Sequence, residues 1–136
     1  MTETALPTIE ELDARQSWQL LEEQEYGRIA VVRSGRPEIY PVNYLALQGR
    51  IRFHTAPGAK LFGVLLDGHV AFEIDGVDGG TAWSVLVKGT AEEVQLSPDR
   101  GDPGPLPEVP WMPERRTAVV DITPIEVTGR RFRRPA

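Results

Sequence analysis

The chain has 136 residues, no cysteine, a net charge of −5 and a sequence pI of about 5.1. This length fits one domain, and without cysteine the chain has neither disulfides nor thiolate chemistry. The acidic balance argues against nucleic acid as a partner. No apolar run reaches the roughly 18 residues that a membrane-spanning helix needs, and the N-terminus lacks a signal-peptide pattern. We therefore expect a cytoplasmic protein that neither spans a membrane nor binds nucleic acid.

The N-terminal part of the chain predicts two short helices after a tail formed by residues 1–7. Capping-box spacing occurs twice, first from Thr8 and again from Asp13. We expect one helix near 9–13 and a second near 15–24, which Gly27 ends.

The next part predicts three consecutive strands. Residues 28–33 contain a continuous apolar run, residues 38–47 form the second strand, and apolar and polar residues alternate in the third strand from Ile51. Ser34-Gly35 and Gln48-Gly49 are typical hairpin turns. The sequence therefore predicts an antiparallel meander.

A strand that runs directly into a helix follows the meander. Pro57-Gly58 ends the strand, and the apolar residues of 59–66 recur at helical spacing. The first turn of a helix presents free N–H groups and the positive end of the dipole. Thr55 and Lys60 flank that turn, so this segment predicts a site for one phosphate group, although such a lysine is often only solvated.

The second half of the chain predicts three more strands. We expect strands at 69–75 and 82–96 with a loop over 76–80 between them, and Gly89 suggests a bulge in the longer strand. Prolines are concentrated in 98–113, which predicts an irregular loop. The last strand is expected at 118–127, with an edge or a bend at Pro124, before an arginine-rich end over 129–134.

Six strands, few helices and glycine-marked corners predict one domain over residues 1–136, folded as a small closed or nearly closed β-barrel. A β-sandwich is the alternative. The helix expected between the third and fourth strands favours the barrel. His54 and His69 lack the companion residues of a metal site, so no metal centre is expected.

Four segments carry a family resemblance: Arg36 to Tyr44 (RPEIYPVNY), Phe53 to Lys60 (FHTAPGAK), Trp83 to Gly89 (WSVLVKG) and Gly129 to Arg131. Their order, spacing and residue types resemble the pyridoxamine 5′-phosphate oxidase-like family of flavin-binding split barrels, and more narrowly its short bacterial branch. The resemblance covers roughly residues 17–131. It rests on the four segments together, because no single segment is specific to the family.

The resemblance implies a six-stranded Greek-key split barrel that forms a homodimer and holds FMN in the groove between protomers. It implies that the FMN phosphate lies near Thr55 and Lys60, where the residues themselves predict an anion site. The candidate cofactor-binding residues are Pro41, Val42, Asn43, His54, Thr55, Lys60, Trp83, Ser84 and Arg130.

The resemblance also implies that the backbone of Pro41 to Asn43 lies along the isoalloxazine ring, where Pro41 has no N–H to offer. Because His54 and Thr55 are adjacent in a strand, their side chains leave opposite faces, and we expect His54 beside the ring or the ribityl chain. Trp83 and Ser84 are expected to contribute from the barrel wall or from the second protomer, although core packing is the plain alternative for Trp83.

The arginines at the C-terminal end have two interpretations. Arg130 and Arg131 either supply positive charge to the flavin or the substrate, or belong to a solvated tail. The Arg-x-His motif of pyridoxamine phosphate oxidases is absent here, so the synthesis of pyridoxal phosphate is not expected.

No residue is identifiable as a dedicated acid or base, and the catalytic residues stay unassigned. The resemblance implies an FMN-dependent oxidoreductase that transfers hydride to or from a small molecule with the help of an electron donor. The alternatives are a reductase that uses the deazaflavin F420, a non-catalytic flavin- or haem-binding module, and a barrel without cofactor.

Overall fold

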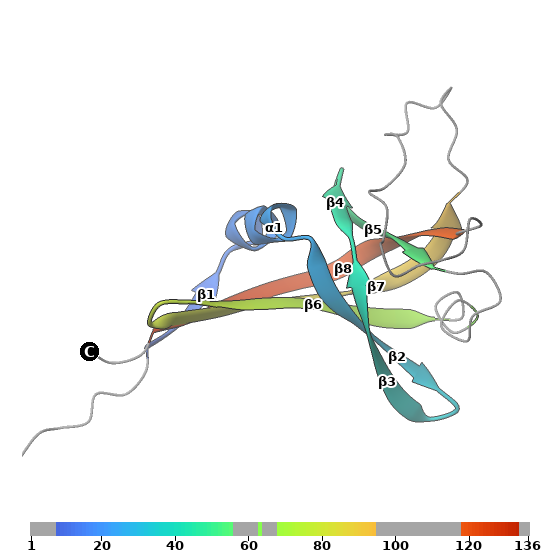
Figure 1. Cartoon of the computed structure of the whole chain (residues 1–136), viewed down its shortest axis with the longest axis horizontal. Helices are drawn as coiled ribbons and strands as arrows, with labels where there is room; N and C mark the ends of the chain where they lie inside the picture. The colour runs from blue at the N-terminus through green and yellow to red at the C-terminus, as the bar shows by residue number, and fades with distance from the viewer. Residues whose placement is uncertain (1–7, 56–62, 64–67, 95–117, 134–136) are drawn as a thin grey trace, which may run out of the picture.

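The computed structural model describes residues 8–55, 63, 68–94 and 118–133. Within them, eight antiparallel strands form one sheet, and one helix packs on it (Figure 1). The expected tail at 1–7, the Pro-rich loop at 98–113 and, apart from Gly63, the expected helix at 59–66 lie outside the described residues. The elements are β1 (Thr8–Leu12), α1 (Ala14–Glu23), β2 (Tyr26–Arg33), β3 (Arg36–Asn43), β4 (Leu45–Leu47), β5 (Arg50–Thr55), β6 (His69–Asp78), β7 (Thr81–Val94) and β8 (Ala118–Arg133).

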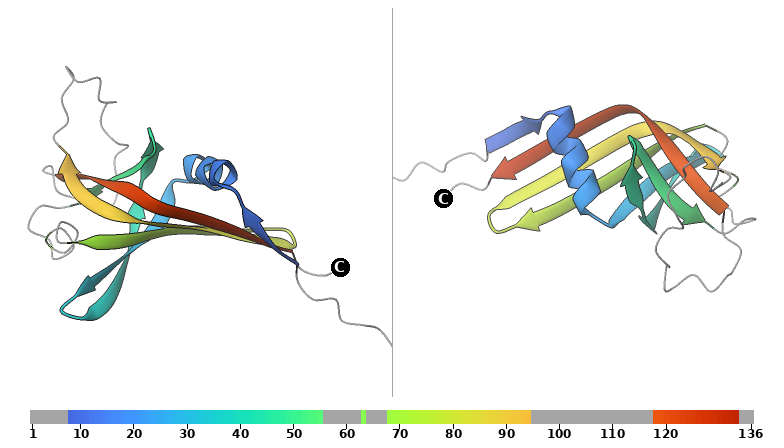
Figure 2. Two further views of the ribbon diagram at one scale, coloured as in Figure 1. Left: turned by 180° about the vertical axis from the view of Figure 1, so that it is seen from behind. Right: turned by 90° about the horizontal axis from the view of Figure 1, so that it is seen from above.

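The sheet is curled so that its two edges approach each other. Its strand order is β3-β2-β6-β7-β8-β5-β4, and β1 pairs separately with β8. The edge strands β3 and β4 follow one another in the chain with only Tyr44 between them. The sheet must therefore turn back on itself (Figure 2). This single curled sheet confirms the predicted barrel type of fold and excludes the sandwich.

Tyr44 marks the point where the chain passes from one edge of the sheet to the other. Its side chain is buried, and its hydroxyl donates a hydrogen bond of 2.7 Å to the carbonyl oxygen of Leu21. Its ring meets Phe72 edge-on, with 4.8 Å between the ring centroids. The strand expected over 38–47 is therefore two strands, because its first half pairs with β2 and its second half with β5.

The N-terminal segment corrects a second prediction. Residues 9–13 do not form a helix, since Thr8–Leu12 pairs with the end of β8. The backbone hydrogen bonds that the edge of β8 offers outweigh the local capping-box signal. In the described part of the chain there are accordingly eight strands, compared with the six that we expected. The second helix is confirmed as α1, whose capping box joins Asp13 and Gln16 through bonds of 2.7 and 3.0 Å.

Both predicted hairpin turns are present. Ser34 and Gly35 have φ values of 52° and 74°, and Gln48 and Gly49 have 50° and 75°. Positive φ at both central residues matches the right-handed twist of the flanking strands. These two turns set the pairing of β2 with β3 and of β4 with β5.

The loop expected over 76–80 is shorter than predicted. β6 continues to Asp78, and the turn consists of Gly79 and Gly80. Gly76 lies inside β6. Glycine is needed at this position because a Cβ atom would come within 2.6 Å of the Trp83 indole. That glycine therefore permits close packing and does not mark a loop. The arginine-rich end is likewise not a tail, since β8 continues to Arg133.

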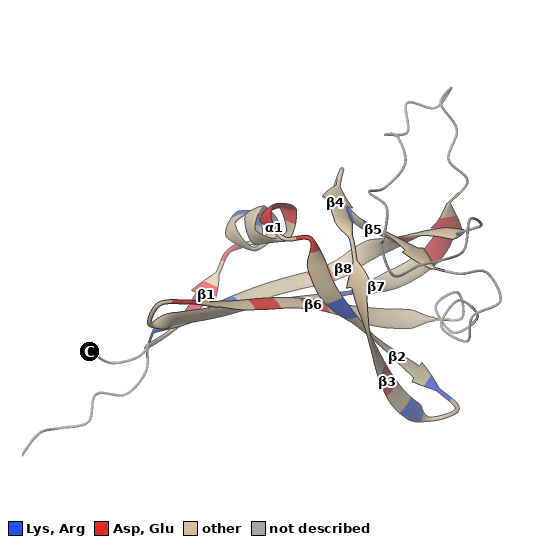
Figure 3. Cartoon of the chain, in the orientation of Figure 1, with Lys and Arg blue, Asp and Glu red and all other residues tan. Residues whose placement is uncertain are grey.

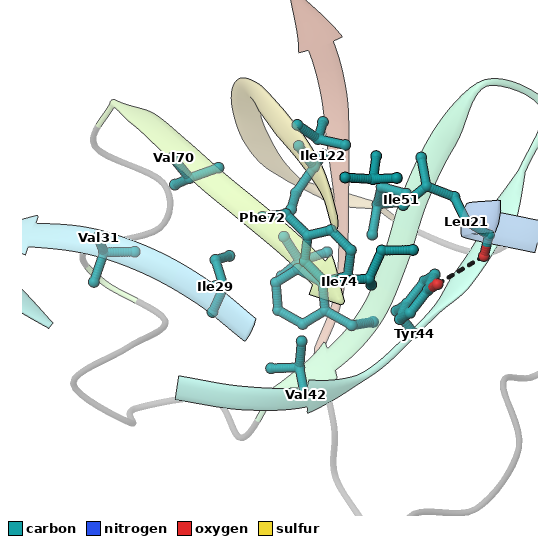
Figure 4. Packing of buried hydrophobic residues seen from close by; sticks show 14 residues of the cluster. Leu21, Ile29, Val31, Val42, Tyr44, Ile51, Val70, Phe72, Ile74 and Ile122 are labelled. Carbon is teal, nitrogen blue, oxygen red and sulfur yellow. Dashed lines mark hydrogen bonds between the residues drawn. The ribbon is translucent and has the colours of Figure 1, made fainter. Parts of the chain in front are cut away.

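Buried side chains from alternate strand positions and from α1 form one core (Figure 4). Phe53 and Phe72 are the largest of those that are fully enclosed. Burial of an apolar side chain of this kind contributes about 1.5–3 kcal/mol. The core residues are Leu21, Ile29, Val31, Val42, Tyr44, Ile51, Phe53, Val70, Phe72, Ile74, Val85, Val87, Val120 and Ile122.

The bulge predicted at Gly89 is confirmed. Lys88 pairs with Glu126 while Gly89 pairs with Pro124, so Ile125 is the extra residue on β8. A Cβ on Gly89 would lie 2.2 Å from the carbonyl oxygen of Thr123. Only glycine lets the two backbones approach this closely, and the irregular pairing accommodates a proline that lacks an N–H.

We expect Gly89→Ala to lower the free energy of unfolding by about 2 kcal/mol or more, because the new methyl group overlaps the β8 backbone. Gly80→Ala is the matched control, since no atom lies within 4 Å of its Cβ position. Urea denaturation of both variants measures the effect. Equal stability of the two variants would contradict the close approach.

Candidate functional site

The predicted site residues divide between the two faces of the sheet. Three of them face the core side of the sheet: Val42, Thr55 and Trp83. Of these, Val42 and Thr55 are buried, and Trp83 is partly buried and packs against the core. Lys60 lies outside the described residues. The outer face carries the other five: Pro41, Asn43, His54, Ser84 and Arg130.

A first group of these residues lies where β3 approaches β5. Leu45, two residues after Asn43, pairs with Arg52, two residues before His54. β3 and β5 are in contact. The strand that contains Pro41 to Asn43 therefore lies beside the strand that ends at Thr55.

A second group lies at the other end of β8. Trp83 pairs with Arg131 and Ser84 with Arg130, whereas Thr55 pairs with Ala118. Ala118 and Arg131 are thirteen residues apart, which corresponds to about 40 Å of extended strand. One copy of the chain does not bring the two groups together.

Trp83 belongs to a hollow between α1 and the ends of β6, β7 and β8, with a volume of about 790 Å³. Gly76 gives the indole its place against β6. Arg131 also lines the hollow, and its Nη1 lies 3.6 Å from Oε2 of Glu10. The hollow therefore combines an aromatic surface with a guanidinium group held in place by an ion pair.

Asn43 has an unsatisfied polar atom in the first group. Its Oδ1 is enclosed and has no hydrogen-bond partner within the described part of the chain. β3 is an edge of the sheet, paired with β2 alone, and Pro41 on it is exposed. An enclosed acceptor beside free strand-edge backbone fits a ligand that offers N–H or O–H groups.

Sequence reasoning missed a buried ion pair two residues from His54. The Arg52 guanidinium donates to Asp121 through Nε and Nη2 at 2.7 and 3.0 Å, and Asp121 is fully buried. Arg50 adds a longer contact of 3.7 Å to the same carboxylate. Asp121 stands inside the apolar run of residues 118–122, and an aspartate in such a run could have indicated a buried ion pair. The pair fixes the outer face of β5 against β8 beside the first group.

A second missed cluster joins Arg28 on β2 to Glu73 and Asp75 on β6. Arg28 donates a hydrogen bond to Asp75, and its Nη2 lies 3.5 Å from Oε1 of Glu73. Burial raises the pKa of Glu73 from 4.5 to about 6, and hydrogen bonding with Asp75 acts in the same direction. That hydrogen bond, followed by Arg28, lowers the pKa of Asp75. Arg28 pairs with Pro41, so this cluster lies beside the first group.

The remaining charges form no single-sign surface. Acidic and basic positions are interspersed over the described strands (Figure 3). Among the described residues, no group of three histidine or acidic side chains has the arrangement of a metal site. The described helix is too short and too polar to cross a membrane.

These features can be compared with known proteins. The model of the pyridoxamine 5′-phosphate oxidase family matches residues 13–131. The chain belongs to this family. The match begins at Asp13, the N-cap of α1, and ends at Arg131 in β8.

Individual relatives agree over most of the chain. An uncharacterized protein of Mycobacterium tuberculosis is 34% identical over 134 residues, which cover 90% of this chain and 84% of the relative. The FAD-binding protein of Mycobacterium smegmatis has 32% identity and a TM-score of 0.81, covering 93% of this chain and all of that one. A candidate pyridoxamine 5′-phosphate oxidase from Corynebacterium glutamicum has 37% identity and a TM-score of 0.80, with coverages of 93% and 99%.

We expect Asp121→Ala to lower the free energy of unfolding by about 3–5 kcal/mol, because it leaves the Arg52 charge buried without its carboxylate. The double variant Arg52→Met/Asp121→Leu should recover most of that loss. Chemical denaturation measures both variants. A double variant as unstable as Asp121→Ala would contradict this assignment.

We expect Glu73→Gln to stabilise the protein more at pH 8 than at pH 5. A raised pKa means that folding disfavours the carboxylate, so the unfavourable contribution of Glu73 disappears as the pH falls through about 6 towards 4.5. Glutamine does not titrate. Melting temperatures across this range measure the difference between variant and wild type. A difference that does not change with pH would be inconsistent with the raised pKa.

Proposed function

We propose that the protein binds a flavin nucleotide on the outer surface where β3 approaches β5. The observation that carries the proposal is the enclosed, unpartnered Oδ1 of Asn43 beside the free edge of β3. An isoalloxazine ring has an N–H group and carbonyl oxygens along one edge, and these complement an amide acceptor and strand backbone. Membership of the family and the FAD-binding relative at 32% identity support the same ligand class.

The Pro41–Asn43 backbone would hold the ring, with His54 as its neighbour. We place the phosphate beyond the end of β5, with the Lys60 ammonium group as its partner, because the Thr55 side chain is buried on the core side. FMN is the first candidate for the bound flavin, and FAD is the second because a relative of this chain is a FAD-binding protein. F420 and haem are the alternative cofactors.

We further propose that the protein is a homodimer whose flavin sites are shared. Trp83, Ser84 and Arg130 lie at the far end of β8 from Thr55. A single flavin on the outer face meets both groups when a second copy supplies Ser84 and Arg130, whereas Trp83 faces the core side. Each two-fold related pair of chains then contains two equivalent sites.

A bound flavin supplies hydride transfer between an electron donor and a small molecule, which makes an oxidoreductase the proposed activity. The chain itself positions the ring and limits the access of water. Burial raises the pKa of Glu73 to about 6, and Arg28 next to it pairs with Pro41. We therefore propose Glu73 as a group that gives or takes a proton beside the Pro41–Asn43 segment.

Titration of the stripped protein with FMN, FAD, riboflavin, F420 and haemin tests this function. We expect a flavin nucleotide to bind most tightly. Lys60→Ala should weaken FMN at least about tenfold and leave riboflavin nearly unchanged, because riboflavin has no phosphate to lose an ion pair. Arg15→Ala, an exposed position on α1, is the control.

Equal losses of FMN and riboflavin in Lys60→Ala would remove the phosphate assignment. Preference for F420 or haemin would move the function to that cofactor, and no binding of any of the five would overturn the proposal. Reduction of the bound flavin by a nicotinamide nucleotide, followed by oxidation by an added acceptor, separates an enzyme from a storage or sensing module.

A further inference from the structure

The hollow beside Trp83 lies on the core side of the sheet, away from the proposed flavin surface. We call it the Trp83 hollow; α1 lies across the strands that form its floor (Figure 2). Its volume of about 790 Å³ is within the range of small-molecule sites, about 300–1,000 Å³. Ser84 and Arg130 alternate with its floor residues and face outward. A ligand in this hollow is therefore separated from the flavin surface by the sheet.

Strand register arranges the floor of the Trp83 hollow in two rows. Each row consists of three paired residues, one each from β6, β7 and β8, and all six residues line the hollow. The rows are two residues apart along every strand, so their side chains share one face of the sheet. They are Gly76–Trp83–Arg131 and Asp78–Thr81–Arg133.

The β8 side of the Trp83 hollow carries positive charge. Nη1 of Arg131 lies 3.6 Å from Oε2 of Glu10 on β1, and this ion pair holds the guanidinium in place. Arg133 is exposed and has no ion-pair partner within the described part of the chain. A planar guanidinium binds a carboxylate through two parallel hydrogen bonds. The β8 side therefore fits the acid group of a ligand.

The opposite side of the Trp83 hollow offers hydrogen-bond acceptors. Asp78 on β6 and Glu23 at the end of α1 line it, and the last turn of α1 has no basic residue. The last carbonyl groups of a helix lack partners within the helix and form the negative end of its dipole. Asp78 and Arg133 are separated by β7, which amounts to two strand spacings or about 10 Å. Donors and acceptors thus face each other across the indole of Trp83.

We propose that the Trp83 hollow binds a planar aromatic acid that carries an N–H or O–H donor at its far end. The carboxylate of this ligand pairs with Arg133 and lies beside Arg131. Its rings stack on the Trp83 indole, which Gly76 holds against β6. Its donor group meets Asp78. The proposal goes beyond the proposed function, because the ligand is a second small molecule on the other face of the sheet.

Isothermal titration calorimetry with three related compounds tests the site. The first is aminonaphthoate (6-amino-2-naphthoate), which has both end groups of the proposed ligand on a bicyclic ring. The second, naphthoate, lacks the amino group, and the third, naphthamide, lacks the charge. The variants are Arg133→Gln, Asp78→Ala and Trp83→Leu. The matched control is Arg36→Gln, because Arg36 is an exposed arginine on β3 that does not line the hollow.

We expect aminonaphthoate to bind the wild type and Arg36→Gln equally well, and naphthamide to bind at least about tenfold more weakly, because it forms no ion pair. Arg133→Gln should weaken aminonaphthoate about tenfold and change naphthamide little. Asp78→Ala should remove the preference for aminonaphthoate over naphthoate. Trp83→Leu should weaken all three compounds, since all three stack on the indole.

Several results would overturn the site: no binding of either acid at millimolar concentration, equal affinity for acid and amide, or an Arg133→Gln variant that binds as the wild type does. Full displacement of aminonaphthoate by FMN would place both ligands in one site and equally overturn it. FMN titration without the acid reports the proposed function separately, so acid binding without flavin binding would keep this site and remove that function. Circular dichroism verifies folding, and Arg133→Gln and Asp78→Ala, both at exposed positions, decide the result if Trp83→Leu does not fold.

Discussion

The burial of Tyr44 is the constraint on which the rest of the structure depends. Its hydroxyl is hydrogen-bonded to the carbonyl oxygen of Leu21 in α1 and its ring lies against Phe72, so the chain is fixed where it passes from β3 to β4. Here the curled sheet closes, and β3 contacts β5. The candidate flavin surface is thus a product of barrel closure, because its parts come from the two edges of one sheet.

The length of β8 imposes the second constraint. The strand pairs with β5 at one end and with β1 and the start of β7 at the other. Residues that the family resemblance groups around one cofactor are therefore far apart in one copy. The proposed sharing of each site between two copies resolves this separation.

Local signals in the sequence predicted the two type I′ turns, the helix capped by Asp13 and the bulge at Gly89. Two other local signals led to wrong predictions. Gly76 suggested a loop but permits close contact with Trp83, and the capping-box spacing from Thr8 suggested a helix but Thr8–Leu12 is a strand that pairs with β8. For the candidate site, the sequence indicated only a set of segments. Arg52–Asp121 and Arg28–Glu73–Asp75 were not found, because strand register decides which charges meet and the sequence does not display it.

The measurement that tests the central claim most directly is complementation between two variants damaged at opposite ends of the shared site. Lys60→Ala and Arg130→Glu are each expected to bind FMN poorly. If two copies share each site, co-expression produces mixed dimers with one undamaged site, and about a quarter of all sites should recover full affinity. Mixed dimers that recover no tight FMN binding, although each variant is folded, would contradict the shared flavin site.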